Sequence, residues 1–327
     1  RVGVIYIAHR LEEIFEIGDR VTVLRDGRHI QTCAVSEADK RSLIRAMVGR
    51  ELEQEFPKVK QVRGEEVFRV KHLSTLSGLH NVSFAVFRGE IFGLAGLVGA
   101  GRSQLAHALF GADPVASGKM FLQGKEIRPR SPREAIDLGI GLLTEDRNRY
   151  GLIMQMSVRE NVSLSNLIEV LRGPFISRRK EDGVASTYVQ KLHIKTPTLQ
   201  QRVEFLSGGN RQKVVLARWL FANCKVLIFD EPTTGIDVGV KYEIYNLIND
   251  LAKSGRGMIL ISSDLPELLG MCDRIGVMCE GRITGVLKRN EATQEKIMTL
   301  ATGGTIAGRA EAGSSETGQL GEVGGAH

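Results

Sequence analysis

The sequence predicts an α/β fold, and three observations support this prediction. The apolar run Ile91–Ala95 has the pattern of a buried strand and leads through a glycine-rich loop into a helical stretch. A second buried-strand run, Lys225–Phe229, is followed directly by two carboxylates. The third observation is a repeated strand–helix–strand pattern, present once near each end of the chain. Because open α/β sheets bind ligands at the carboxyl ends of their strands, the loops there are the candidate sites.

Length and composition exclude several classes of protein. At roughly 150 residues per domain, 327 residues correspond to about two domains. Apolar residues make up 42% and charged residues 25%, which excludes a wholly disordered chain, a collagen and a disulfide scaffold. No apolar run approaches the ~20 residues of a membrane-spanning helix. Four scattered cysteines favour reduced thiols over a metal site, and a net charge of +6 is too mild to indicate nucleic-acid binding.

Residues 5–28 and 259–282 align without gaps at an offset of 254, with nine identities in 24 positions. Each copy has the pattern strand, short helix, strand, turn and strand, with the turn at Asp26-Gly27 or Glu280-Gly281. Since only the end of the first copy is present, we expect an N-terminally truncated piece of a tandem protein, although two convergent hairpins would look similar. On this hypothesis, DNA upstream of the Arg1 codon encodes a first phosphate loop roughly 160 residues earlier.

Four segments follow from the repeat and from local composition. Residues 1–48 are the C-terminal remnant of the first copy, and residues 65–302 form the second. Between them, residues 49–64 hold seven charges and a proline, which is typical of a linker. Residues 303–327 contain eight glycines and few large aliphatic side chains, so we expect a disordered tail.

The glycine-rich loop has the spacing G-x-x-x-x-G-[K/R]-S between a strand and a helix, as in a phosphate-binding loop. Glycines let backbone amides point at a phosphate, and the helix N-terminus favours negative charge. Arg102 stands where a lysine is usual; it is bulkier and planar, so the loop could place a nucleotide poorly. A glycine-rich turn without a ligand is the alternative. The residues expected to bind nucleotide are Gly96, Gly99, Ala100, Gly101, Arg102, Ser103 and Gln104.

Two further segments carry chemistry. Asp230 and Glu231 follow the second buried strand, where Asp230 suits Mg²⁺ together with Ser103, and Glu231 suits a general base acting on water. The segment Leu206–Gln212 places Ser207 and two glycines before a helix, which can bind an anion. By itself, this segment is more simply an ordinary helix N-cap.

These segments, in this order, resemble the ATP-binding cassette (ABC) ATPases. LSGGNRQKVVLARWL is similar to their signature motif, and FDEPTTGID is similar to the Walker B strand with its D-loop, which includes Asp237. GLAGLVGAGRSQLAHALFG, TEDRNRYGL and SSDLPELLGMCDRI resemble the second cassette of the tandem ATPases of bacterial simple-sugar importers of the ribose, galactose and xylose type. The resemblance covers about residues 1–302. It implies a RecA-like P-loop core with a small β subdomain and a helical subdomain at about residues 150–215.

The resemblance also implies cofactors, partners and a location. ATP and Mg²⁺ would bind to a peripheral ATPase on the cytoplasmic face of the bacterial inner membrane. The ATPase would lie beneath permease subunits that a periplasmic sugar-binding protein supplies, and it would not bind nucleic acid.

In such ATPases each nucleotide lies between the phosphate loop of one cassette and the signature of the other. His9 matches the switch histidine, so it and the signature serve one site, whose phosphate loop belongs to a missing N-terminal part or to a second copy. The signature residues are Leu206, Ser207, Gly208, Gly209, Asn210 and Gln212.

The site formed by the second copy departs from the family pattern at four places. Arg102 replaces lysine, Ser263 stands where the first copy has His9, and Glu145 replaces the usual glutamine. We find no aromatic residue between Phe68 and Phe84 suited to stack on adenine. Asp230 and Glu231 are retained, so we expect a site that binds ATP and hydrolyses it slowly or not at all.

Two alternatives remain. A nucleotide-binding regulatory or assembly module without turnover would differ from an ATPase in showing no hydrolysis that a site mutation abolishes. A tandem-cassette translation factor that binds ribosomal RNA is disfavoured, because those proteins have a long charged helical linker and this linker has about 16 residues. In the first-copy remnant we expect four apolar side chains to be abnormally exposed: Ile5, Ile7, Val21 and Val23.

Overall fold

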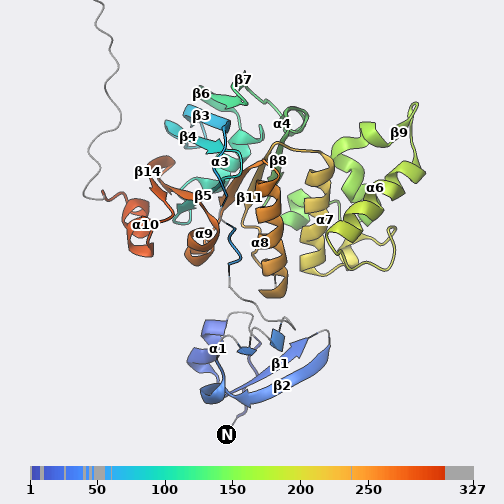
Figure 1. The fold of residues 1–327 in the computed structure, drawn as a ribbon, viewed down its shortest axis with the longest axis vertical. Helices are drawn as coiled ribbons and strands as arrows, with labels where there is room; N and C mark the ends of the chain where they lie inside the picture. Colours follow the sequence, from blue (N-terminus) through green and yellow to red (C-terminus); the bar gives the residue numbers. More distant parts are fainter. Residues whose placement is uncertain are drawn as a thin grey trace, which may run out of the picture.

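The computed structural model describes residues 2–7, 11–25, 27–39, 42–43, 46–47, 56–59, 61–236 and 238–305. His9, Asp237 and residues 306–327 of the predicted tail therefore lie outside the described residues. The described chain forms a large α/β unit and a small N-terminal unit, which Figure 1 draws below it.

A six-stranded central sheet confirms the predicted α/β fold. In the described part of the chain its order is β14-β13-β5-β12-β11-β8, and neighbouring strands are parallel except for the edge hairpin β13–β14. Its strands are β5 (Ile91–Gly96), β8 (Ile140–Leu143), β11 (Val226–Asp230), β12 (Gly257–Ile261), β13 (Arg274–Cys279) and β14 (Arg282–Lys288). Every residue of β11 and β12 is buried, as in strands that are covered on both faces.

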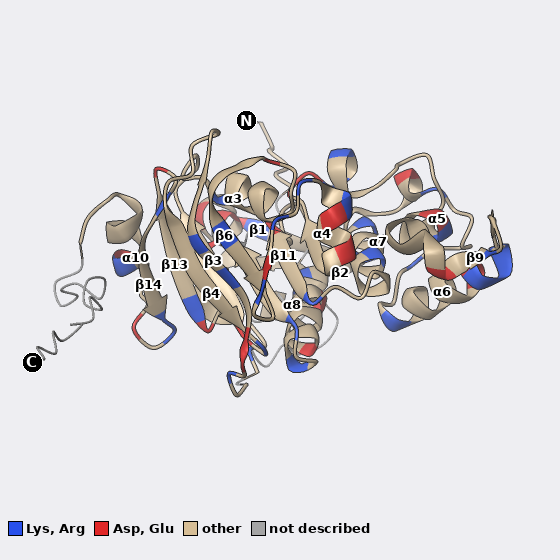
Figure 2. Ribbon diagram, turned by 90° about the horizontal axis from the view of Figure 1, so that it is seen from above, with Lys and Arg blue, Asp and Glu red and all other residues tan. Residues whose placement is uncertain are grey.

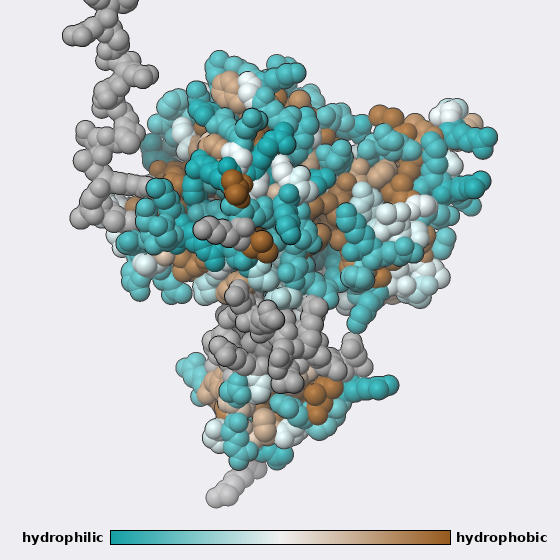
Figure 3. All heavy atoms as spheres, in the orientation of Figure 1, coloured by the Kyte–Doolittle hydropathy of each residue, from teal (hydrophilic) through white to brown (hydrophobic). Residues whose placement is uncertain are grey.

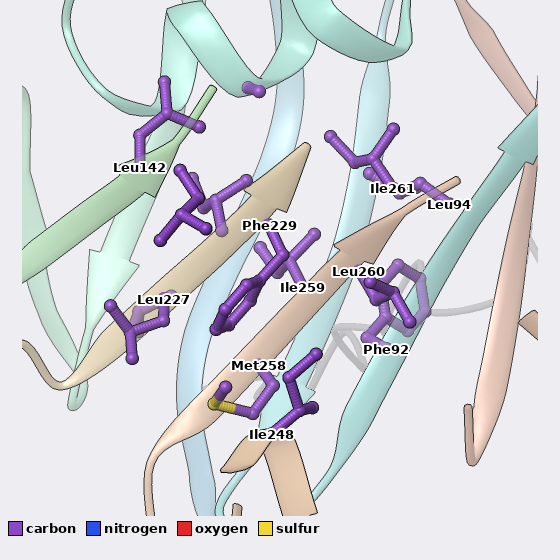
Figure 4. Close-up of a cluster of buried hydrophobic side chains, with 14 of the residues drawn as sticks. Phe92, Leu94, Leu142, Leu227, Phe229, Ile248, Met258, Ile259, Leu260 and Ile261 are labelled. Atoms are coloured by element: carbon purple, nitrogen blue, oxygen red, sulfur yellow. The ribbon is translucent and has the colours of Figure 1, made fainter. Parts of the chain in front are cut away.

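Helices pack against this sheet and enclose its core. The described helices that contact it are α3 (Arg102–Leu109), α4 (Pro132–Leu138), α7 (Gly208–Phe221), α8 (Val238–Lys253), α9 (Leu265–Met271) and α10 (Gln294–Ala301). Figure 4 shows part of this core, with Phe92 of β5, Phe229 of β11 and Ile259 of β12 among its buried side chains. This packing fixes the strand ends that carry the candidate site.

A small antiparallel sheet lies beside the phosphate-loop end of the core. Its order is β4-β3-β6-β7, with β3 (Glu66–Thr75), β4 (Val82–Phe87), β6 (Val115–Leu122) and β7 (Lys125–Ile127). The loop between β3 and β4 contacts the start of α3, because a Cβ on Gly101 would lie 3.3 Å from Leu79.

Helices between β8 and β11 form a separate lobe, to the right in Figure 1. Its elements are the π-helical turn η2 (Arg147–Gly151), α5 (Val158–Ser163), η3 (Leu164–Val170), the hairpin β9 (Leu171–Arg172) and β10 (Phe175–Ile176), α6 (Arg178–Lys191), η4 (Val203–Phe205) and α7 (Gly208–Phe221). Basic side chains gather near β9 and the start of α6 (Figure 2), and hydrophobic surface is visible over the lobe in Figure 3. Among the described helices of the whole chain, none is long and apolar enough to cross a membrane.

The N-terminal unit corrects two expectations. It contains α1 (Leu11–Ile17), β1 (Arg20–Arg25), β2 (Arg28–Ala34) and η1 (Val35–Glu37), but residues 2–7 form no strand. Ile259 and Ile261, which match Ile5 and Ile7, lie in β12 between β5 and β11, whereas no described strand pairs with residues 2–7. A strand needs such a partner for its backbone groups.

Of the four apolar side chains predicted to be exposed in this unit, two are exposed and two are buried. Ile5 and Ile7 are each 93% exposed, as expected. The expectation for Val21 and Val23 is wrong, because they are 7% and 4% exposed and pack with the fully buried Leu43. Alternate residues of β1 thus share one covered face, and the unit buries a small cluster of its own.

The predicted linker is docked on the large unit where it is described. The ring of Phe56 lies 5.6 Å from that of Tyr245 on α8, and the Asn249 side-chain amide donates to the Pro57 carbonyl at 2.7 Å. Lys58 pairs with Asp273 at 2.8 Å with its side chain only 6% exposed. We call residues 56–59 and 61 the strap.

Candidate nucleotide site

The glycine-rich loop connects the end of β5 to the start of α3, as predicted. Gly101 precedes α3 with φ of +102°, a left-handed conformation that favours glycine. A Cβ on Gly96 would lie 2.7 Å from the Met278 carbonyl oxygen, so β13 leaves no room for a side chain there. Leu97 and Val98 face solvent, Ala100 is buried and Gln104 is exposed. The loop backbone thus packs against β13 on one side and is exposed to solvent on the other. An exposed glycine-rich loop before a helix suits an anionic ligand.

Arg102 extends from the loop to the ends of two neighbouring strands. Its Nη1 donates to the Ser262 carbonyl at 2.6 Å and lies 3.7 Å from Oε1 of Glu231. The side chains of Arg102 and Glu231 are each only 11% exposed, so water screens their attraction weakly. The arginine that replaces the usual lysine therefore contacts the carboxylate predicted to act as a base.

Asp230 lies at the end of β11 and is 2% exposed. Burial raises its pKa to about 6; the Ser103 hydroxyl opposes this shift, while the charges of Glu231 and Glu145 add to it. Its Oδ1 has no hydrogen-bond partner among the described residues. A buried, unpartnered carboxylate oxygen beside a hydroxyl fits Mg²⁺, which prefers hard oxygen ligands.

Glu231 is held in a strained and well-defined position. Its φ is +50°, which non-glycine residues rarely adopt, and its N–H donates to the Ile261 carbonyl at 3.0 Å. Its Oε2 accepts hydrogen bonds from Ser263 at 3.2 Å and from Thr234 at 3.3 Å. Ser263, which stands where the first copy has His9, therefore contacts this carboxylate directly.

A buried hydrogen-bonded network lies behind the strand ends, and sequence reasoning missed its role. Glu267 of α9 is fully buried and accepts from Thr233 at 2.9 Å; Ser262 and Tyr245 also hydrogen-bond to it. Burial raises the pKa of Glu267. The available signal was that Glu267 is one of the identical positions of the repeat, where it matches Glu13.

The signature segment lies at the start of α7, with Ser207 exposed and Leu206 and Gln212 buried. Ser207 occupies the N-cap position, but its side chain makes no capping hydrogen bond to the helix. Its Oγ instead accepts from the Asn210 side chain at 2.9 Å, and Asn210 Oδ1 accepts from the Lys195 amide at 2.8 Å. Gly209 packs on Val240, which would lie 2.8 Å from a Cβ there. The Ser207 side chain thus accepts no hydrogen bond from the first backbone N–H groups of α7. An anion can bind to these N–H groups.

Arg147 is a second residue that the sequence analysis did not single out. Its guanidinium donates to the Thr234 carbonyl at 3.1 Å and to the Gly235 carbonyl at 3.4 Å. A Cβ on Gly208 would lie 3.1 Å from its Nη2. Arg147 thus touches the turn after β11 and the start of α7.

The structure therefore brings the glycine-rich loop, Ser103, Asp230 and Glu231 together at the carboxyl edge of the sheet. Phe68 and Phe84 are 1% and 7% exposed, so neither is placed to receive an adenine ring. His9 and Asp237 lie outside the described residues.

An α/β core with a phosphate-type loop and two carboxylates at the end of β11 has the architecture of a P-loop nucleotide-binding domain. Residues 79–234 match the family model described as ABC transporter. A crystal structure of a nucleotide-free ATP-binding cassette from an ABC transporter has a TM-score of 0.62 and 22% identity, covering 72% of this chain and 98% of that one. That likeness shows the fold alone and agrees with a RecA-like P-loop core.

Two curated relatives are much more similar in sequence. The ribose import ATP-binding protein RbsA 3 of Rubrobacter xylanophilus is 52% identical over 301 residues, covering 92% of this chain and 60% of the relative. A putative ribose/galactose/methyl galactoside import ATP-binding protein of Burkholderia cenocepacia is 48% identical over 303 residues, covering 92% and 59%. This chain therefore spans about 60% of the length of these relatives.

Proposed function

We propose that this chain is part of the ATP-hydrolysing subunit that energises import of ribose or a related monosaccharide. The relatives at 48–52% identity carry names of sugar import ATP-binding proteins. The partners are permease subunits, and through them a periplasmic sugar-binding protein, so the chain sits at the cytoplasmic face of the membrane. A second cassette completes the two nucleotide sites.

The observation that carries the proposal is the grouping at the carboxyl edge of the sheet. The loop from Gly96 to Gly101 leads into the N-terminus of α3, which favours a phosphate, and Ser103 with Asp230 offers oxygen ligands for Mg²⁺. The bound metal would neutralise phosphate charge. The Glu231 carboxylate is placed to orient and deprotonate water.

We further propose that this site binds ATP and hydrolyses it slowly. Arg102 pairs with Glu231, and Ser263 and Thr234 donate to the same carboxylate. These contacts engage both carboxylate oxygens of Glu231, which would otherwise be free to receive the proton of an attacking water. The competent site is then the one to which this chain contributes His9 and the signature from Leu206 to Gln212.

The test measures binding of a fluorescent ATP analogue and phosphate release by the whole chain. We expect binding that depends on Mg²⁺ and is weakened at least about tenfold by Asp230→Ala, because the metal loses its buried ligand. Phosphate release should be close to background and unchanged by Glu231→Gln. Glu295→Gln, an exposed site on α10, is the control for binding.

Three results would contradict the proposal in different ways. Failure to bind nucleotide at millimolar concentration would remove the ATPase assignment. Rapid hydrolysis that Glu231→Gln abolishes would refute the slow site alone, and binding without any role in sugar uptake would favour a regulatory module. The sugar class is tested by disrupting the gene in its source organism, where uptake of labelled ribose should fall.

A further inference from the structure

Arg147 lies at a junction of three segments. It begins the π-helical turn that follows β8, and it is two residues from Glu145, whose charge reaches Asp230 and raises the pKa of that carboxyl. Its guanidinium bonds to the carbonyls of Thr234 and Gly235, in the turn after β11. The same group packs on Gly208 at the start of α7.

The bonding of Arg147 differs from that of its neighbour Arg211. Arg211 donates to the carbonyls of Val203 and Glu204 and to the Asn148 side chain, so each of its nitrogens is used. Arg147 makes hydrogen bonds only through its two Nη atoms, at 3.1 and 3.4 Å, and its buried Nε–H has no partner among the described residues. Burial and the charge of Arg211 lower the pKa of Arg147. A desolvated and incompletely bonded cation contributes little to the stability of the fold.

The partners of Arg147 indicate what it does instead. The segment that carries it borders the magnesium-ligand end of β11, and the groups it touches belong to the D-loop turn and the signature helix. On the proposed function, the segment that carries Arg147 serves the nucleotide site of this chain. The D-loop turn and the signature helix serve the second nucleotide site. A planar, five-donor side chain suits this task, because it reaches two carbonyls and a helix start at once.

We infer that Arg147 is a positioning residue that couples the nucleotide site of this chain to the placement of its signature segment. This inference rests on the proposed function. When Mg-ATP binds at Asp230, movement of the Glu145 segment is passed through Arg147 to Gly235 and Gly208. Removing the guanidinium leaves nucleotide binding in place but uncouples the signature from it.

The test is amide hydrogen exchange of the whole chain with and without Mg-ATP. In the wild type, nucleotide should slow exchange at residues 207–212 and 234–236 by about fivefold or more, a typical coupling between sites. Arg147→Ala should bind ATP with an affinity within about twofold of wild type but lose this remote protection. Arg147→Lys should lose most of it, because one ammonium cannot reach both carbonyls.

Arg149→Ala is the matched control, because Arg149 lies on the same turn, is exposed and stacks on Tyr150. It should retain the full remote protection. Protection in Arg147→Ala equal to wild type would overturn the inference while leaving ATP binding intact. If Arg147→Ala does not fold, Arg147→Lys decides the question. Absence of ATP binding in the wild type would instead refute the proposed function and this inference with it.

Discussion

At the scale of single residues, the contacts of Arg102 have the largest consequence. A lysine at this position is a compact charge that can follow the loop towards a phosphate, whereas arginine presents a planar fork. Here the fork is held by the Ser262 carbonyl at 2.6 Å and faces Glu231 at 3.7 Å. ATP binding must therefore compete with a contact between two groups of the site.

Arg102→Lys should make this site a better ATPase. The shorter lysine cannot bond to Ser262 and face Glu231 together, so the carboxylate loses its arginine partner and the ammonium is free for phosphate. Because a general base contributes about 10²–10⁴-fold, we expect hydrolysis to rise about tenfold in a steady-state phosphate-release assay. Arg102→Ala, which frees Glu231 but supplies no cation, is the comparison. No increase with lysine would show that the arginine is not what slows the site.

Glu267→Gln should change how stability depends on pH. Burial raises the pKa of Glu267 in the folded protein, so folding favours its neutral form. The stability it contributes is complete below its unfolded pKa, near 4.5, and is lost as pH rises through the folded value. Relative to Glu267→Gln, the wild type should therefore lose unfolding free energy as the pH is raised from about 5 to about 8. Parallel urea-denaturation results for both proteins across that range would contradict this.

At the scale of elements, the strap shows how a charged segment becomes part of a folded surface. Its ring contact with Tyr245, its hydrogen bonds to Asn249 and the Lys58–Asp273 pair join it to α8 and to the loop before β13. Tyr245 also bonds to the buried Glu267, so the strap adjoins the network behind the nucleotide site. Its composition of charges and one proline predicted a linker and gave no sign of docking.

Gly270→Ala should have opposite effects with and without Phe56. In the wild type, a Cβ on Gly270 would lie 2.7 Å from the Phe56 Cβ and closer still to its ring, so alanine displaces the strap. With Phe56→Ala the clash is gone, and alanine should stabilise helix α9 by about 0.5–1 kcal/mol relative to glycine. We expect destabilisation by about 1–3 kcal/mol in the wild type and slight stabilisation in the variant background, measured by urea denaturation.

Limited proteolysis is a second test of the contact between Gly270 and Phe56. Tryptic cleavage at Lys58 should be faster in Gly270→Ala than in the wild type, because the displaced strap exposes this lysine. An effect of the same sign in both backgrounds would show that Phe56 does not occupy this space in solution.

The elements that the sequence predicted best are those whose pattern is local. β5, β11 and α7 follow from continuous apolar runs and from one-faced helical spacing, and β13–β14 follows from the repeat. The strand expected at residues 5–7 did not form, because strand pairing depends on neighbours that local pattern does not report. Arg147 and the Glu267 network could not be predicted either, because their partners lie far away in sequence.

At the scale of the whole molecule, the two units differ in how they are held together. The large unit has one continuous core across the central sheet and the helical lobe, whereas the buried apolar side chains of the described N-terminal unit are only Val21, Val23 and Leu43. Stability scales with buried apolar surface, so the small unit should unfold first. The apolar Ile5 and Ile7 next to it remain exposed, which favours self-association.

On the proposed function, the N-terminal part of the chain also matters for catalysis, because its sequence contains His9, whereas the large unit carries Glu231. We propose that these residues serve different nucleotide sites, and that the site of Glu231 is slowed by Arg102. In the assembled transporter, Glu231→Gln should therefore leave ATP turnover within about twofold of wild type, whereas His9→Ala should lower it at least about 10²-fold. Both are measured as sugar-stimulated phosphate release in the presence of the permease. The reverse pattern would mean that the arginine contact is broken in the assembly and that the large unit holds the competent site.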